Sequence, residues 1–138
     1  MGIISALGHG IKQTKYALQT GRSGIGPLTL FSTAANPPLP VGEIPGSIDS
    51  GSLSRTHQLA RLAAEQAMAK CEQSPDAVVM GITTGGILTT EMHLQKKAYS
   101  PELYRYHAVG SVAEEIARRY RCTGPVITVS TACSSGTV

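Results

Sequence analysis

Two stretches of the chain carry apolar residues at the spacing of an α-helix with one buried face. The first runs from about Arg55 to Lys70, and its stripe consists of Leu59, Leu62, Ala63 and Ala67. The second runs from about Val109 to Tyr120, with an apolar stripe of Val109, Val112, Ala113, Ile116, Ala117 and Tyr120. The helical period places the charged residues of that second stretch toward solvent: Glu114, Glu115, Arg118 and Arg119. A shorter helix is predicted from Ile11 to Thr20, where Gly21 can adopt the left-handed conformation that ends a helix.

Two apolar runs have the length of β-strands, Ala77 to Ile82 and Val126 to Ser130. The first is almost continuously hydrophobic, which favours a strand covered on both faces and therefore a parallel, layered α/β sheet. Residues 21–54 differ from the rest because glycine and proline recur throughout them. That composition excludes a long regular element and predicts an ordered surface excursion within one domain.

Composition narrows the class of protein. The chain has 138 residues, of which 41% are hydrophobic and 15% charged, with a formal net charge of +3. No block of like charge marks a nucleic-acid or membrane surface, and no segment approaches the roughly 20 apolar residues that cross a bilayer. Cys71, Cys122 and Cys133 are odd in number and lack metal-ligand spacing, so we expect a reduced, cytoplasmic protein without a metal. Cys71 and Cys122, at predicted helix ends, are expected to be small hydrophobic filler.

Cys133 is the candidate nucleophile. It follows a predicted buried strand and precedes Ser134, Ser135 and Gly136, which permit a tight turn and the close approach of a substrate. A thiol becomes nucleophilic when a helix N-terminus or a nearby imidazole favours the thiolate. If a helix begins here, the Cys133 N–H is also a candidate oxyanion donor. Taken alone, however, one cysteine after a strand is more often an inert buried residue.

The residues around Cys133 favour a nucleophile over an inert buried cysteine. The run Thr131–Gly136 resembles the Thr-Ala-Cys-(Ser/Ala)-Ser-Gly active-site signature of the β-ketoacyl-acyl-carrier-protein synthases, a family with the thiolase fold. Further segments are similar to elements of the same family in the same order along the chain. They are Met1–Gly8, Gly21–Ile25, Arg55–Ala60, Gly81–Gly86 and Gly124–Pro125.

The resemblance implies the N-terminal half of a thiolase-like, layered α/β/α fold, with a mostly parallel sheet and helices on both faces. Residues 1–138 would be the N-terminal domain, incomplete and ending just after the nucleophile. It implies that Cys133 accepts an acyl group from an acyl carrier protein and that malonyl carrier protein is then decarboxylated and condensed with it. Fatty acid or polyketide synthesis, a homodimer and the absence of a cofactor are also implied.

Two family features qualify this expectation. Two catalytic histidines of the family lie downstream of the cysteine, and this chain stops at Val138, so the bare chain is expected to be inactive. Its own histidines match neither motif and are expected on the surface or on helix faces: His9, His57, His93 and His107. In the region that shapes the family's acyl tunnel, Glu102 and Arg105 replace expected apolar residues, while Leu103 or Tyr104 could line a substrate pocket.

Three other functions remain open on the sequence. A coenzyme A-dependent acyltransferase of the same fold is disfavoured by the Gly21–Ile25 element and by the signature around Cys133. A non-catalytic partner subunit of a condensing-enzyme pair is disfavoured because such partners usually replace the cysteine. A cysteine hydrolase would use a similar thiol, but its local signatures are missing.

Overall fold

The computed structural model describes residues 1–44 and 53–137, which fall into two compact units. One unit holds residues 1–44 and 62–69, and the other holds residues 53–61 and 70–137. Helix α2 (Arg55–Met68) contributes its first turns to the second unit and its last turns to the first. Within the described ranges, no helix is long and apolar enough to cross a membrane.

The first unit begins with a small antiparallel hairpin and a helix. Strands β1 (Ile4–Ser5) and β2 (Gly8–His9) pair with Ile4 opposite His9, and α1 (Ile11–Gln19) follows at once. Gly21 has φ 64°, and the N–H of the next residue, Arg22, donates to Ala17 O at 2.8 Å. This is the left-handed helix ending that the glycine predicted.

The glycine- and proline-rich excursion contains no long element in its described parts, residues 21–44 and 53–54, as expected. It includes the two-residue strands β3 (Gly26–Pro27) and β4 (Pro40–Val41), which pair antiparallel. The Glu43 carboxylate accepts hydrogen bonds from the backbone N–H groups of Thr29 and Leu30, at 2.5 and 2.8 Å. Residues 45–54 complete the predicted excursion, and of these 45–52 lie outside the described residues.

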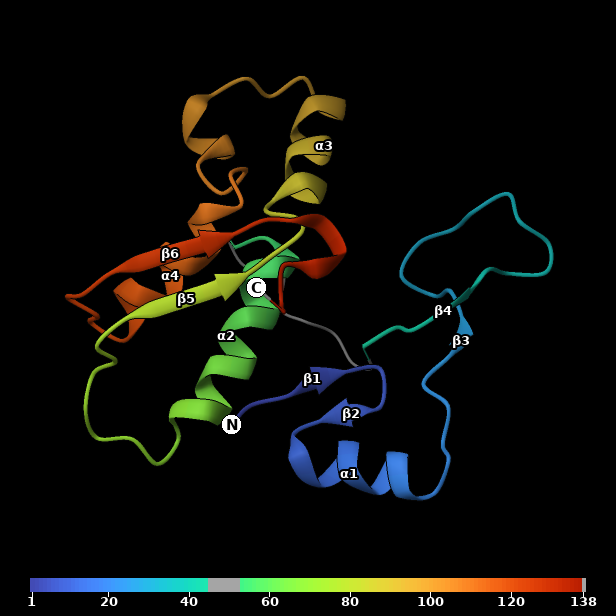
Figure 1. The fold of residues 1–138 in the computed structure, drawn as a ribbon. Helices are drawn as coiled ribbons and strands as arrows, with labels where there is room; N and C mark the ends of the chain where they lie inside the picture. The colour runs from blue at the N-terminus through green and yellow to red at the C-terminus, as the bar shows by residue number, and fades with distance from the viewer. Residues whose placement is uncertain (45–52, 138) are drawn as a thin grey trace. The chain divides into compact units, whose positions relative to one another are not determined.

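The second unit is built on one parallel strand pair. Strands β5 (Val78–Gly81) and β6 (Val126–Val129) run parallel, with Val78 opposite Val126 and Gly81 opposite Val129. Helix α4 (Gly110–Arg119) packs against both strands (Figure 1). The predicted stripe of α4 forms the core here, because four of its members are buried: Val112, Ala113, Ile116 and Ala117.

Two expectations for this unit are wrong. The strand at Val78–Gly81 is not covered on both faces within this chain, since Val79 is 65% exposed and Ile127 on β6 is also exposed. Glu115 does not point to solvent but is buried, and its carboxylate pairs with Arg118 one turn later on α4. Periodicity assigns a face to each residue but does not show which charged residues at the edge of a stripe are covered by other segments.

The segment between β5 and α4 contains a helix that the sequence did not predict as an element. Helix α3 (Ile87–Gln95) starts directly after Gly86, and the 3₁₀ turn η1 (Pro101–Tyr104) follows it. Ser100 directly precedes η1 and Pro101 is its first residue, a position that proline favours because its φ is already close to helical. Apolar side chains on this segment are exposed on several sides, which explains why helical periodicity did not reveal α3: Ile87, Leu88, Met92 and Leu94.

Candidate active site

Cys133 lies on a tight turn at the carboxyl end of β6. The turn is the 3₁₀ helix η2 (Ala132–Ser134), and the Cys133 thiol is free and exposed. Ala132, just before it, has φ 52°, a left-handed conformation that is uncommon for residues other than glycine. Such conformations cost roughly 1 kcal/mol or more and persist where surrounding contacts enforce them, often at functional sites. The backbone therefore presents the thiol outward from a sharp bend.

Buried Ser135 holds this bend together. Its hydroxyl accepts a hydrogen bond from the Thr131 N–H at 2.9 Å and donates to Ala132 O at 2.7 Å. Its side chain is only 6% exposed, so these bonds form away from bulk water. The serine two residues after the cysteine thus fixes the backbone on both sides of Ala132.

The end of β5 and the residues after it also contact the turn that carries Cys133. The Thr83 hydroxyl donates to Ala132 O at 3.2 Å. A Cβ built on Gly81 would lie 2.1 Å from Ser135 O, which is far inside van der Waals contact. Gly81 therefore allows the backbone of the Cys133 turn to rest directly on the strand. The Gly81–Gly86 element, one of the segments that resemble the family, meets the Cys133 turn through Gly81 and Thr83.

The geometry leaves the Cys133 thiol accessible from solvent. The thiol is exposed, and the backbone that carries it is restrained by the hydrogen bonds of Ser135. The element at Cys133 is a three-residue 3₁₀ helix, so no longer helix begins at the cysteine within the described residues.

Leu103 and Tyr104, the predicted substrate-binding residues, lie on η1. The Tyr104 hydroxyl donates to Ala98 O at 2.5 Å, and its ring meets His93 edge to face with 6.0 Å between centroids. The Leu103 side chain is exposed. Tyr104 is thus engaged in local packing, and a role of either residue in substrate binding stays a prediction.

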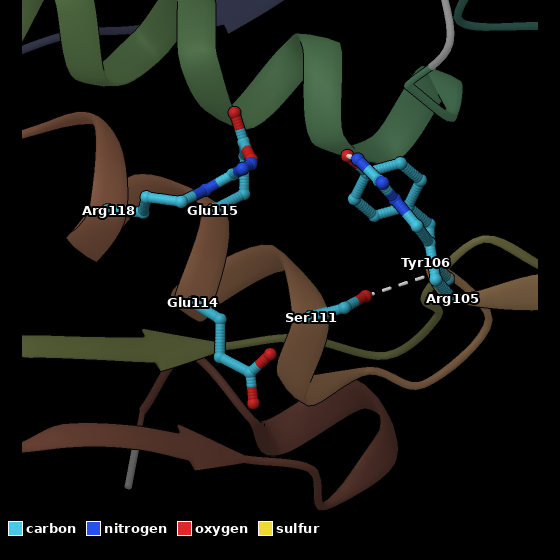
Figure 2. A pocket seen from close by; sticks show the side chains of 6 residues that line it. All are labelled: Arg105, Tyr106, Ser111, Glu114, Glu115 and Arg118. Atoms are coloured by element: carbon cyan, nitrogen blue, oxygen red, sulfur yellow. Dashed lines mark hydrogen bonds and ion pairs between the residues drawn. The ribbon is translucent and has the colours of Figure 1, made fainter. Parts of the chain in front are cut away.

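A hollow of about 290 Å³ opens beside α4, lined by Arg105, Tyr106, Ser111, Glu114, Glu115 and Arg118 (Figure 2). The Arg105 guanidinium lies 4.4 Å from the centre of the Tyr106 ring and also bonds its hydroxyl. The hydrogen bond from Arg105 lowers the pKa of Tyr106, and the nearby Arg118 adds to this effect. Charged side chains of both signs line the hollow: the Arg105 and Arg118 guanidinium groups and the Glu114 and Glu115 carboxylates, with Glu115 paired to Arg118.

His57 lies on helix α2, one of the two settings expected for the histidines, but its burial was not predicted. It is fully buried rather than on the surface, and it lies between two hydroxyls, with Ser54 Oγ 2.6 Å from Nδ1 and Ser111 Oγ 2.9 Å from Nε2. Burial lowers the pKa of His57 below its ordinary value, against an opposing effect from Ser111. One signal was available, because Ser54 three residues before His57 is a typical helix N-cap and brings its hydroxyl to that residue.

The other cysteines have no comparable setting. Cys71 is exposed, so the expectation that it fills the core is wrong, while Cys122 is half-buried. The Cys122 N–H donates to Ala117 O at 2.9 Å as part of the end of α4. Of the three thiols, Cys133 is the one that lies on a restrained turn at the end of the parallel strand pair.

Comparison with known proteins places this geometry in a family. The sequence profile of the beta-ketoacyl synthase N-terminal domain matches residues 1–138. A Streptomyces cyaneus protein named as a polyketide beta-ketoacyl synthase is 28% identical over 99% of this chain and 39% of its own length. The solved structure of the ishigamide ketosynthase/chain length factor superimposes with a TM-score of 0.76 at 27% identity, covering 94% of this chain and 38% of that one. The chain thus spans about two-fifths of each relative's length, and it belongs to the beta-ketoacyl synthase N-terminal domain family.

Proposed function

We propose that this chain supplies the nucleophile of a condensing enzyme that makes 3-oxoacyl thioesters in polyketide or fatty acid synthesis. The observation that carries the proposal is the exposed Cys133 thiol on a turn fixed by Ser135 and seated on Gly81. Family membership supports it, and so does the residue-by-residue match of Thr131–Gly136 to the family signature.

The proposed reaction has two steps. The Cys133 thiolate attacks the carbonyl carbon of an acyl carrier protein thioester, and the carrier thiol leaves. Malonyl carrier protein then loses carbon dioxide, and the resulting carbanion attacks the acyl-enzyme carbonyl. A carbon–carbon bond forms, the Cys133 thiolate leaves, and the 3-oxoacyl group remains on the carrier protein.

This chain would contribute the nucleophile and its support. The backbone turn orients the sulfur, and the exposure of Cys133 leaves room for the carrier-bound thioester. The resemblance implies that two histidines downstream of Cys133 stabilise the decarboxylation and the thioester oxyanion. Because this chain covers about two-fifths of its relatives, the complete gene product is the form to assay.

The proposal also includes the wider fold. We infer that β5 and β6 belong to a larger, mostly parallel sheet with helices on both faces, in a layered α/β/α arrangement. The exposed Val79, Val126 and Ile127 side chains support this, because apolar strand residues are normally covered in such sheets. A homodimer, an acyl carrier protein as partner and a cytoplasmic location with free thiols complete the proposal.

One alternative deserves a direct test, a non-catalytic partner subunit, because the structural relative is named as a ketosynthase/chain length factor. The retained Cys133 favours the catalytic subunit. The test is to mix the complete gene product with acyl and malonyl carrier protein and to follow 3-oxoacyl carrier protein by mass spectrometry. We expect product from the wild type and none from Cys133→Ala. Product formation that survives Cys133→Ala, or none from a folded wild-type protein, would overturn the proposal.

A further inference from the structure

The hydrogen-bond partners of the buried His57 imidazole indicate which of its nitrogens carries a proton. The Ser111 hydroxyl donates to Ala108 O at 2.5 Å, so its oxygen is left to accept a hydrogen bond from His57 Nε2–H at 2.9 Å. His57 Nδ1 then lacks a proton and accepts one from the Ser54 hydroxyl at 2.6 Å. The arrangement therefore fits a neutral imidazole protonated on Nε2, with every proton assigned a partner.

The imidazole connects two elements that are far apart in sequence. Ser54 precedes α2, and its carbonyl accepts the first helical bond from the Gln58 N–H at 3.1 Å, so the bond to Nδ1 is local to α2. Ser111 lies on α4, and its oxygen is also 3.2 Å from Tyr106 O, the contact drawn in Figure 2. The Tyr106 ring meets the imidazole edge to face at 4.8 Å. His57 thus ties the start of α2 to the backbone of residues 106–111.

Residues 106–108 in turn rest on the glycine turn after β5. The Gly86 N–H donates to His107 O at 3.3 Å. A Cβ on Gly85 would lie 2.3 Å from His107 O, and one on Gly86 would lie 2.3 Å from Tyr106 O. The two backbones are therefore in direct contact, and a shift of one must move the other.

The same glycine turn supports the nucleophile. Thr83, two residues before Gly85, donates to Ala132 O, and Gly81 touches the backbone of Ser135. A continuous series of contacts therefore runs from His57 through Ser111, residues 106–108 and residues 81–86 to the Cys133 turn.

We propose that His57 is a positioning residue for Cys133. In its neutral form it acts through Ser111 and residues 106–108 on the glycine turn, residues 81–86, which contacts the turn that carries the nucleophile. The inference rests on the proposed function of Cys133. A protonated imidazole would donate from both nitrogens, and the buried Ser54 hydroxyl would then have to turn its own proton away from Nδ1. Protonation of His57 should therefore loosen this series of contacts and slow acyl transfer to Cys133.

The surrounding charges favour the neutral form. Tyr106 packs on His57, with the Arg105 guanidinium over its ring and Arg118 close enough to lower its pKa. The buried acidic residue on α4 near this site is Glu115, and its carboxylate is paired with Arg118. On the α2 side, the side chain that meets Nδ1 is the uncharged Ser54 hydroxyl.

Two substitutions of His57 separate its two hydrogen bonds. His57→Gln can place an amide N–H near the position of Nε2 and keep the bond to Ser111. His57→Asn can replace the Nδ1 acceptor for Ser54 but is too short to reach Ser111. Ser111→Ala removes the hydroxyl that joins His57 Nε2 to the backbone of Ala108. The matched control is His9→Gln, which changes an exposed histidine of the other unit.

The experiment measures the rate of acyl transfer to Cys133 in the complete gene product between pH 5.5 and 8, at temperatures where circular dichroism shows each variant folded. We expect His57→Asn and Ser111→Ala to be slower by about tenfold, since small displacements of reacting groups have effects of this order. His57→Gln should stay within about twofold at pH 7.5 and lack the additional decline of the wild type below about pH 6.5. His9→Gln should follow the wild type throughout.

Several results would overturn the inference. Folded His57→Asn and Ser111→Ala proteins with wild-type rates would do so, as would a His57→Gln protein that keeps the full acidic decline. If His57→Asn and Ser111→Ala do not fold, the pH profile of His57→Gln decides whether the inference stands. If the wild type takes up no acyl group, the proposed function fails, and the pH profile of Cys133 alkylation by iodoacetamide then tests His57 separately. Identical alkylation profiles in wild type and His57→Gln would reject the positioning role.

Discussion

Helices α2 and α4 look alike as sequence but bury different kinds of residue. In α4 the apolar stripe is covered by β5 and β6, and Val112 is completely buried. In α2 the stripe residues Leu59 and Leu62 are only half-buried, and the fully buried side chain is the polar His57. Both helices are amphipathic, but α4 is held mainly by apolar packing and the start of α2 by hydrogen bonds.

The difference shows what each kind of burial contributes. Apolar packing of α4 stabilises the strand pair without requiring a specific geometry at the nucleophile. The hydrogen bonds of His57 fix particular atoms, because each buried donor and acceptor needs its partner in place. We therefore expect α4 to dominate the stability of this unit and α2, through His57, to affect the nucleophile.

The largest effect on stability should come from the core of α4. Ile116→Ala removes a side chain that is 7% exposed, and we expect a loss of about 3 kcal/mol in the free energy of unfolding. Leu62→Ala on α2 removes a half-buried side chain and should cost about 1 kcal/mol. Urea denaturation of the complete gene product measures both. Equal losses from the two substitutions would contradict the contrast between the helices.

A smaller effect is expected from the protonation of His57. Because burial lowers its pKa below 6.5, the unfolded chain binds the proton at a higher pH than the folded chain does. The stabilisation is present above about pH 6.5 and decreases as the pH falls from there through the lowered pKa of the folded state. Thermal melts between pH 5 and 8 should show a flatter profile for His57→Gln than for the wild type. Parallel profiles would indicate that His57 is not held neutral.

The smallest effect separates two neighbouring carboxylates on α4. Glu115 is buried and paired with Arg118, whereas Glu114 is exposed. Glu115→Gln should reduce stability by about 1 kcal/mol, while Glu114→Gln should change it by less than about 0.5 kcal/mol. Because Arg118 is largely exposed, the Glu115 effect should shrink as salt is added. A larger loss of stability from Glu114→Gln than from Glu115→Gln would contradict the assignment of Glu115 to the buried face of α4 and of Glu114 to the exposed face.

The sequence predicted the regular part of this structure well. Periodicity identified α2 and α4, the apolar runs identified β5 and β6, and Gly21 identified the end of α1. These features depend on local spacing and on conformations that residue types favour by themselves. Helix α3 was missed because its apolar residues, including Ile87 and Leu94, are not gathered on one covered face.

The support of the site was harder to predict than its nucleophile. Cys133 stands out in the sequence through its neighbours, but the contacts of Gly81 and Ser135 depend on a parallel strand pair that joins residues 78–81 to residues 126–129. The burial of His57 was not predicted, because a single polar side chain within a helix gives no sign of a partner 54 positions away. Long-range hydrogen bonds of this kind are set by the tertiary fold and leave no local pattern.

The most direct test of the central claim is the site of acylation. The complete gene product is incubated with an acyl carrier protein thioester, digested, and analysed by tandem mass spectrometry for the mass of each cysteine-containing peptide. We expect an acyl group on Cys133 and none on Cys71 or Cys122, with the adduct absent from Cys133→Ala. An adduct that persists in folded Cys133→Ala, or wild-type protein that stays unmodified at Cys133, would show that Cys133 is not the acyl-accepting nucleophile.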